Sequence, residues 1–365
     1  MAKVKFDEIA RECRSTFKGD KTGVAIVGLE HIVPNEMLVK DYEVYTENTF
    51  SKSFKKGQIL FGRRRAYQQK AGVATFDGIC SGDITVIEAI ESKVDKDLLP
   101  FIIQNERFFE HAVQGSAGSL SPRVKWEHLA SYEFDLPPLS DQKILADKLW
   151  AAYRLKESYK KLLATTDEMV KSQFIEMFGD NVSKKKISDV CDVRGGSTPT
   201  RTTKEFWNNG TISWFTVEDI YEQGRYISET KQHITKLATK KCFVYPVDTV
   251  LICCTASVGE YAITKKEMAS NQQFNGMIIK DKSELHPEYL LYVASTLKED
   301  LLRQAGKTTI NFVSRSKLEN IEIPVPPYSE QLGFVSVYRQ ADKSKFELRK
   351  SIEAIDAVIK SLINN

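Results

Sequence analysis

A run of cations, amides and one tyrosine directly follows the apolar segment Ile59-Leu60-Phe61. Arginine and glutamine hydrogen-bond to the edges of bases, and arginine also contacts phosphates. The run therefore predicts a loop that contacts nucleic acid, although a solvated basic loop would have the same composition. A later loop adds two weaker candidates, for which the solvated interpretation is favoured. The candidates are Arg63, Arg64, Arg65, Tyr67, Gln68 and Gln69, with Ser119 and Arg123 from the later loop.

A second polar set begins at residue 197 and continues at the expected ends of later strands. Hydroxyl groups and cations between residues 198 and 204 suit phosphate binding, but an ordinary capping loop explains them equally well. Each of the other members, taken singly, is better explained as structural. Trp207 and Trp214 are expected in the core rather than as stacking platforms. The candidates are Thr198, Thr200, Arg201, Thr202, Lys204, Thr255, Ser257, Gln272, Gln273, Asn275 and Asn311.

Two motifs imitate catalytic sites. Val325-Pro326-Pro327-Tyr328 resembles the active-site loop of a methyltransferase, but valine cannot accept a hydrogen bond from a target amine. Gly306-Lys307-Thr308-Thr309 resembles the end of a phosphate-binding loop, but Leu301 stands where the first glycine is required. We therefore expect no catalytic residue and no cofactor in this chain.

The composition indicates which kinds of site and which cellular environment the chain can have. Six cysteines and five histidines show no metal-ligand spacing, so we expect reduced thiols and no metal. The net charge is only +3, so any nucleic-acid contact must come from local placement of charge. No stretch approaches the ~18 apolar residues of a membrane span, and we expect a cytoplasmic protein without membrane contact.

A duplicated segment divides the chain. Residues 129–142 and 318–331 match at one offset. In each copy a short alternating strand is stopped by a proline pair, and a serine is expected to cap the helix that follows. The matched pairs are Leu129 and Leu318, Pro137-Pro138 and Pro326-Pro327, Ser140 and Ser329, and Asp141-Gln142 and Glu330-Gln331.

A long helix is predicted after each copy. Residues 140–178 contain neither proline nor glycine, and apolar residues recur in both segments at spacings of three and four. Such stripes require a partner helix. The simplest inference is that the two helices pack on each other, although pairing with another copy of the chain is an alternative. The predicted packing residues are Leu145, Leu149, Leu155, Tyr159, Leu162, Met169, Leu348, Ile352, Ile355, Ile359 and Leu362.

The predicted organisation is therefore two globules, each followed by a long helix. A chain of 365 residues suffices for two domains that each bury a core. Neither globule alternates strands and helices regularly, which favours an α/β (α+β) class with mixed, mostly antiparallel short strands. The predicted parts are globules at 1–139 and 181–327 and helices at 140–180 and 328–365.

The second globule carries an ordered series of motifs. Ile187-Ser188-Asp189-Val190 is followed by Arg194-Gly195-Gly196-Ser197-Thr198-Pro199, Phe206-Trp207 and, later, Asn271-Gln272-Gln273-Phe274. With the duplicated proline segments, this series resembles the specificity subunits of type I restriction–modification enzymes over almost the whole chain. The first globule lacks the Gly-Ser-Thr-Pro and tryptophan elements and offers residues 13–19 instead, so we interpret it as a diverged domain.

The resemblance implies two target-recognition domains separated by two long antiparallel helices that form a coiled-coil-like spacer. It implies that each domain reads one half of an asymmetric, bipartite site in double-stranded DNA. It also implies that the helices dock two methyltransferase subunits, that restriction (translocase and nuclease) subunits join the larger assembly, and that catalysis belongs to these partners. A coiled-coil scaffold whose globules bind protein or RNA is the main alternative, and a stand-alone enzyme is a third.

Overall fold

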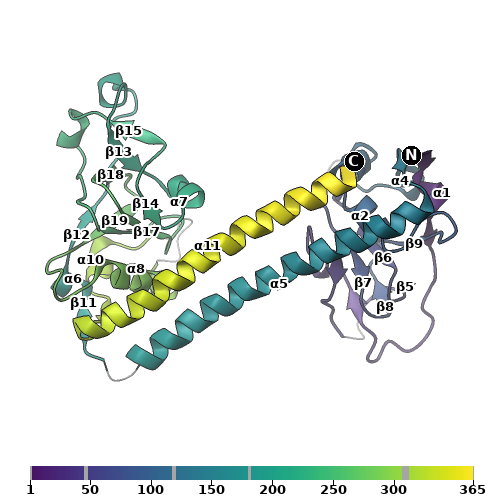
Figure 1. The fold of residues 1–365 in the computed structure, drawn as a ribbon, viewed down its shortest axis with the longest axis horizontal. Coiled ribbons are helices and arrows are strands. Elements are labelled where there is room, and N and C mark those ends of the chain that lie inside the picture. Colours follow the sequence, from purple (N-terminus) through teal and green to yellow (C-terminus); the bar gives the residue numbers. More distant parts are fainter. Residues whose placement is uncertain (1, 45–47, 117–120, 180–181, 306–311, 365) are drawn as a thin grey trace. The chain divides into compact units, whose positions relative to one another are not determined.

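The chain forms two compact units. The computed structural model describes residues 2–44, 48–116, 121–179, 182–305 and 312–364 (Figure 1). The first unit comprises Met1–Leu162 with Leu348–Asn365, and the second comprises Leu163–Glu347. Each unit therefore contains one globule together with part of each long helix.

The first unit is built on a mixed five-stranded sheet. Neighbouring strands are antiparallel except at one edge, where the last strand runs parallel to its neighbour. All four residues of the central strand are buried, as expected for a strand covered on both faces. The strand order is β2 (Ala10–Cys13), β9 (Ile84–Ala89), β6 (Ile59–Gly62), β7 (Ala71–Ala74) and β4 (Leu38–Val39).

The second unit repeats this sheet. Its strands follow the same order, with the same parallel edge pair and a fully buried central strand. Both units are thus mixed α/β, as the sequence predicted. The order is β12 (Cys191–Gly195), β19 (Phe274–Ile279), β16 (Val250–Cys253), β17 (Tyr261–Thr264) and β14 (Tyr226–Ile227).

A smaller three-stranded sheet accompanies each large one. Both contain a parallel pair, to which one antiparallel strand is added. The order is β3 (Ile26–Val27), β8 (Gly78–Cys80) and β5 (Lys52–Phe54) in the first unit, and β15 (Gln232–Ile234), β13 (Ile212–Phe215) and β18 (Met268–Ser270) in the second.

Isolated bridges show that the small sheets are also equivalent. In the first unit Ile26 of β3 forms an antiparallel bridge with Glu43, which corresponds to the antiparallel pairing of β13 with β15 in the second unit. In the second unit Tyr245 forms an antiparallel bridge with Met268 of β18, which corresponds to the antiparallel pairing of β5 with β8 in the first unit. The duplication therefore extends to every sheet of the two units.

A two-stranded antiparallel ribbon precedes each long helix. β1 (Ala2–Lys5) pairs with β10 (Glu133–Leu136), and β11 (Lys184–Lys186) pairs with β20 (Glu322–Pro324). β10 and β20 are the strands predicted before the proline pairs. Each ribbon joins the start of a globule to its end.

Short helices complete each globule. Their buried faces pack on the large sheet, with Phe6, Phe61 and Phe108 at the centre of the first core and Tyr289 and Phe334 in the second. The helices are α1 (Phe6–Ile9), α2 (Leu99–Ile103), α3 (Glu106–Gln114) and α4 (Trp126–Ala130), then α6 (Ile187–Val190), α7 (Val217–Gln223), α8 (Pro287–Thr296), α9 (Lys298–Gln304) and α10 (Arg315–Glu319), with 3-10 turns η1 (Leu29–His31), η2 (Ala66–Gln68), η3 (Lys204–Phe206) and η4 (Ala238–Lys240).

The two long helices are α5 (Leu139–Phe178) and α11 (Tyr328–Asn364), of 40 and 37 residues (Figure 1). Each begins directly after its proline pair, so the expectation that Ser140 and Ser329 cap them was wrong. The Ser140 hydroxyl donates to the Asp141 carboxylate at 3.1 Å, while the carbonyl of Pro138 accepts the amide of Asp141. No described helix is long and apolar enough to cross a membrane.

The glutamine of the duplicated segment ties each long helix to its globule. Gln331 is fully buried, accepts the His286 amide at 2.8 Å and donates to the carbonyls of Glu284 and Pro326, both at 2.8 Å. Gln142 accepts the Asp95 amide and donates to the Pro137 carbonyl, both at 2.9 Å. These bonds explain why glutamine occurs in both copies.

Within each unit the beginning of one long helix packs on the end of the other, so the pair is antiparallel. In the first unit Leu149 of α5 shares a core with Ile359 and Leu362 of α11. In the second unit Phe174 of α5 contacts Phe334 of α11, with ring centroids 5.3 Å apart. The predicted residues Leu348, Ile352 and Ile355 are half-buried, as are Leu145 and Tyr159.

Two equivalent ion pairs also join the helices. Lys156 donates to Asp356 at 2.6 Å in the first unit, and Lys345 donates to Asp167 at 2.7 Å in the second. Both lysine side chains are only 13% exposed. Lys156 and Lys345 occupy the same position in the two copies of the duplicated helix.

The inward stripe of α5 was predicted only in part, because three of its predicted residues are exposed. Leu155, Leu162 and Met169 are 45%, 49% and 50% exposed. The stripe one residue further along, about 100° round the helix, instead faces inward and contains Lys156 and Val170. Because the inward stripe contains a lysine, its hydropathy does not mark it as buried. The outer stripe is more apolar, and the sequence therefore predicted that it would face the partner helix.

Candidate nucleic-acid interface

Three segments of the first unit meet at one end of its large sheet. The Arg63 amide, just beyond β6, donates to the Asp83 carbonyl in the turn between β8 and β9, at 2.9 Å. The Val124 amide, just before α4, donates to the Arg63 carbonyl at 2.9 Å. The predicted basic loop is therefore held by backbone bonds on both sides.

Two predicted arginines share one carboxylate there. Arg123 Nε donates to Asp83 Oδ1 at 2.6 Å, and Arg64 Nη1 donates to Asp83 Oδ2 at 3.4 Å. Arg64 Nε also donates to the Ser121 hydroxyl at 2.9 Å. The hydrogen bond from Arg123 lowers the pKa of Asp83 below its usual value. The side chains of Arg64 and Arg123 remain 38% and 48% exposed, so the cluster presents positive charge outward.

The other predicted residues of this loop lie around the cluster. Arg65 and Tyr67 are exposed, whereas Gln68 and Gln69 are half-buried in and after η2. Arg63 is half-buried, and its Nε is buried without a hydrogen-bond partner among the described residues. Ser119 lies outside the described residues.

A polar groove of about 490 Å³ borders Asp83. Its hydroxyl side chains come from separate turns, so no single stretch of the sequence predicts the groove. Lys52, one of its lining residues, donates to the Ile84 carbonyl at 2.7 Å. The groove is lined by Arg14, Ser15, Thr16, Thr49, Phe50, Ser51, Lys52, Ser81, Gly82 and Asp83.

The second unit builds the same sheet end. The Cys254 amide, just beyond β16, donates to the Gln273 carbonyl at 2.8 Å, and the Val313 amide donates to the Cys254 carbonyl at 2.9 Å. Thr255 pairs with Phe312 as Arg64 pairs with Arg123. The predicted residues Thr255 and Gln273 thus occupy the places of Arg64 and Asp83.

Gln272 and Thr198 are also brought together in the second unit. The Thr198 hydroxyl donates to the Gln272 carboxamide, and both residues are exposed. Ser257 is half-buried in the turn after β16. Asn275 is only 9% exposed within β19, so we correct its assignment to a structural position. Asn311 lies outside the described residues.

Arg201 is held by the two tryptophans. Its guanidinium lies 3.9 Å from the ring centroid of Trp207 and 4.6 Å from that of Trp214, and Nη1 donates to Gln232 at 2.6 Å. Trp214 is buried and Trp207 is partly buried, as expected of core residues. The neighbouring candidates Thr200, Thr202 and Lys204 are exposed.

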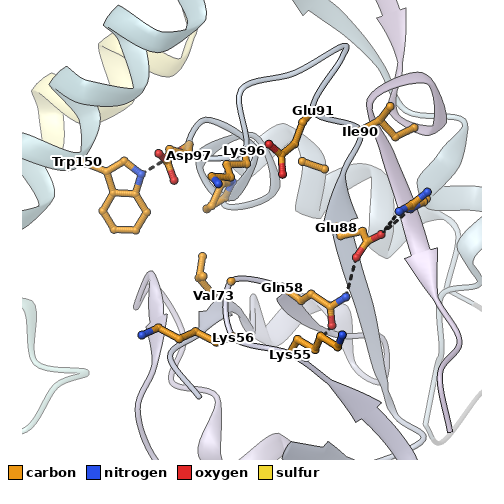
Figure 2. A pocket seen from close by; sticks show the side chains of 14 residues that line it. Lys55, Lys56, Gln58, Val73, Glu88, Ile90, Glu91, Lys96, Asp97 and Trp150 are labelled. Carbon is orange, nitrogen blue, oxygen red and sulfur yellow. Dashed lines mark hydrogen bonds and ion pairs between the residues drawn. The ribbon is translucent and has the colours of Figure 1, made fainter. Parts of the chain in front are cut away.

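A larger pocket of about 680 Å³ lies beside the start of β6 and the end of β9, at the other end of the first unit's sheet from Asp83. Figure 2 shows the side chains that line it. Its walls carry both signs of charge, including Lys55, Lys96 and Glu88. The Trp150 indole donates to the Asp97 carbonyl at 2.8 Å. No serine, cysteine or histidine is among the lining residues.

The described cysteines are all free thiols, and burial raises the pKa of Cys254 to about 11. Among the described residues, no group of three histidine, cysteine, aspartate or glutamate side chains could hold a metal ion. The sheet ends are therefore characterised by arginine, amide and hydroxyl groups.

Comparison with known sequences identifies relatives. Residues 8–165 and 179–355 match the family described as type I restriction modification DNA specificity domain. The MjaIX specificity subunit of Methanocaldococcus jannaschii is 34% identical over 185 residues, which cover 50% of this chain and 42% of that protein. The EcoprrI specificity subunit of Escherichia coli is 31% identical over 152 residues, which cover 41% of this chain and 38% of that protein. The match thus spans less than half the length of either relative.

Two solved structures share the fold. The S subunit of a type I restriction–modification system from M. genitalium has a TM-score of 0.63 at 11% identity, covering 100% of this chain and 95% of that chain. A chain from a study of the assembly of the type I R-M system has a TM-score of 0.57 at 18% identity, covering 99% of this chain and 96% of that chain. The family match covers both globules and most of the two long helices. The chain therefore belongs to the family of type I restriction–modification DNA specificity domains.

Proposed function

We propose that this chain is the non-catalytic specificity subunit of a type I restriction–modification assembly and reads double-stranded DNA. The observation that carries the proposal is the duplicated sheet end. In the two units the same backbone framework carries different side chains, Arg64 and Asp83 in one and Thr255 and Gln273 in the other. A protein that reads two different half-sites needs this combination of constant framework and variable surface.

The charge of the first sheet end supports DNA as the ligand. Arg64, Arg65 and Arg123 are at least partly exposed there, with one carboxylate, that of Asp83, between two of them. Base contacts by arginine specify sequence, and phosphate contacts add affinity that falls with salt. In the second unit, hydroxyl and amide groups would take the same roles.

The long helices would separate the two readers and dock the partners. We retain the boundaries predicted from the sequence, with recognition domains at 1–139 and 181–327 and spacer helices at 140–180 and 328–365. Two methyltransferase subunits would bind to this spacer, and restriction subunits would join the larger assembly. Methyl transfer and cleavage would belong to those partners.

The test is to express the chain with its modification partner and to map methylated bases across the genome. We expect an asymmetric, bipartite motif. Arg64→Ala should relax the half-site read by the first unit and leave the other unchanged, because Arg64 lies in one unit only. Exchanging Lys96, an exposed cation at the opposite end of the sheet, for alanine is the control. Methylation without a bipartite motif would contradict the proposal and favour a scaffold that binds protein or RNA.

A further inference from the structure

We propose that three equivalent positions in each unit determine which bases it reads. They are Arg64, Asp83 and Arg123 in the first unit (the charged triad) and Thr255, Gln273 and Phe312 in the second (the uncharged triad). This inference rests on the proposed function and names the residues and base types that carry it.

The backbone places the two triads in the same way. An isolated antiparallel bridge joins Arg64 to Arg123 in the first unit. The equivalent bridge joins Thr255 to Phe312 in the second. The Arg63 amide donates to the Asp83 carbonyl at 2.9 Å, and the Cys254 amide donates to the Gln273 carbonyl at 2.8 Å. The preceding strands are paired alike, β6 with β9 and β16 with β19. The side chains are therefore the main variable at these positions.

The charged triad suits guanine. Asp83 holds Arg123, from which it accepts at 2.6 Å, and it also pairs with Arg64 at 3.4 Å, while the Ser121 hydroxyl accepts from Arg64 Nε at 2.9 Å. Within the described part of the chain, Arg64 Nη2 and Arg123 Nη1 are not engaged in these bonds and can donate to a ligand. Two arginines with one carboxylate leave a net positive charge. A fixed arginine loses little freedom on binding, and arginine pairs with the O6 and N7 acceptors of guanine.

The uncharged triad suits adenine and thymine. The Gln273 carboxamide accepts from Asn271 Nδ2 at 2.9 Å, which orients it and leaves its own amide group to donate. Glutamine pairs with the N6 and N7 groups of adenine, while threonine methyl groups and phenylalanine contact the methyl group of thymine. The Phe312 side chain is 56% exposed, which an apolar residue at this position needs if it is to reach a base.

The contrast with Arg201 supports the choice of positions. Arg201 is one of two cations that the sequence favoured in the second unit, but its guanidinium is already engaged by two indole rings and by Gln232. Arg201 therefore stabilises its own loop, whereas in the charged triad Arg64 Nη2 and Arg123 Nη1 take no part in the bonds to Asp83.

The experiment uses the full chain with its modification partner and maps methylated bases for three variants. Asp83→Asn removes the charge that holds Arg123 and pairs with Arg64, so guanine in the first unit's half-site should be discriminated about tenfold less, with the other half-site unchanged. Phe312→Ala should relax a thymine in the second half-site only. Asp97→Asn makes the same charge change as Asp83→Asn at the opposite end of the sheet and should alter neither half-site.

The outcomes separate the two proposals. Relaxation at a single base of one half-site supports the inference, and continued reading of the other bases of that half-site shows that the altered unit is folded. A bipartite wild-type motif that neither triad variant alters, or a first half-site without guanine, would overturn the inference and leave the proposed function intact. A wild-type chain that directs no sequence-specific methylation would overturn both.

Discussion

Replacing Gln331 by methionine should destabilise the second unit by about 3 kcal/mol. Methionine has nearly the volume of glutamine, so packing is retained and mainly the polar contacts are lost. Gln331 makes three hydrogen bonds of 2.8 Å in a fully buried setting, and each is worth about 1 kcal/mol net. Gln142 makes two bonds of 2.9 Å, so Gln142→Met should cost the first unit about 2 kcal/mol.

The assay must report on each unit separately, because two units need not unfold in one step. Native-state hydrogen exchange in increasing urea gives a local free energy of opening for each core. Protection in β16 and β19 reports on the second unit, and protection in β6 and β9 reports on the first. Gln340, an exposed glutamine of the same helix, provides the control, since Gln340→Met should change neither value by more than about 0.5 kcal/mol.

A loss of stability in Gln331→Met no larger than that in Gln340→Met would contradict this role of Gln331. The role would also be contradicted if the loss were confined to the frayed end of α11, with β16 and β19 unaffected. Either result would mean that the buried glutamine does not connect the helix to its globule.

Two further predictions concern charged contacts in the first unit. Lys156→Asp should destabilise this unit by about 1–2 kcal/mol, because it places two carboxylates together, and adding Asp356→Lys should restore most of the loss in urea unfolding. The second concerns Asp83, whose pKa is lowered in the folded chain chiefly by its bond from Arg123. Its stabilisation should be fully present above the unfolded pKa of about 4 and lost as pH falls through the lower folded value. The difference in Tm between wild type and Asp83→Asn should therefore shrink toward zero on acidification; a constant difference from pH 7 to pH 2 would contradict this.

The architecture was largely predictable because its signals are local. Proline pairs mark the strand ends at Leu136 and Pro324, and an uninterrupted run after Leu139 marks α5. The equivalence of the small sheets was not predictable, since it depends on single bridges such as Ile26 with Glu43.

The candidate site was predictable only in part. Arg64 and Arg123 were identified by residue type, but Asp83 was missed because Ser81-Gly82-Asp83 has the composition of an ordinary turn. Asp83 matters because it pairs in the folded chain with Arg64 and Arg123, which lie 19 and 40 positions away in the sequence. Asn275 was misassigned for the opposite reason, since a polar residue buried in a strand cannot be distinguished by type from an exposed one.

The two lysine–aspartate pairs also have a consequence for misalignment of the long helices. If α11 slipped by one heptad in one direction, Lys156 would face Arg349 and Lys345 would face Lys160, so both lysines would meet like charge. A slip in the other direction would bring them against the apolar side chains of Ile363 and Phe174, leaving two ammonium groups unneutralised. The pairs therefore penalise either error, which a purely apolar seam with a seven-residue repeat would tolerate far better.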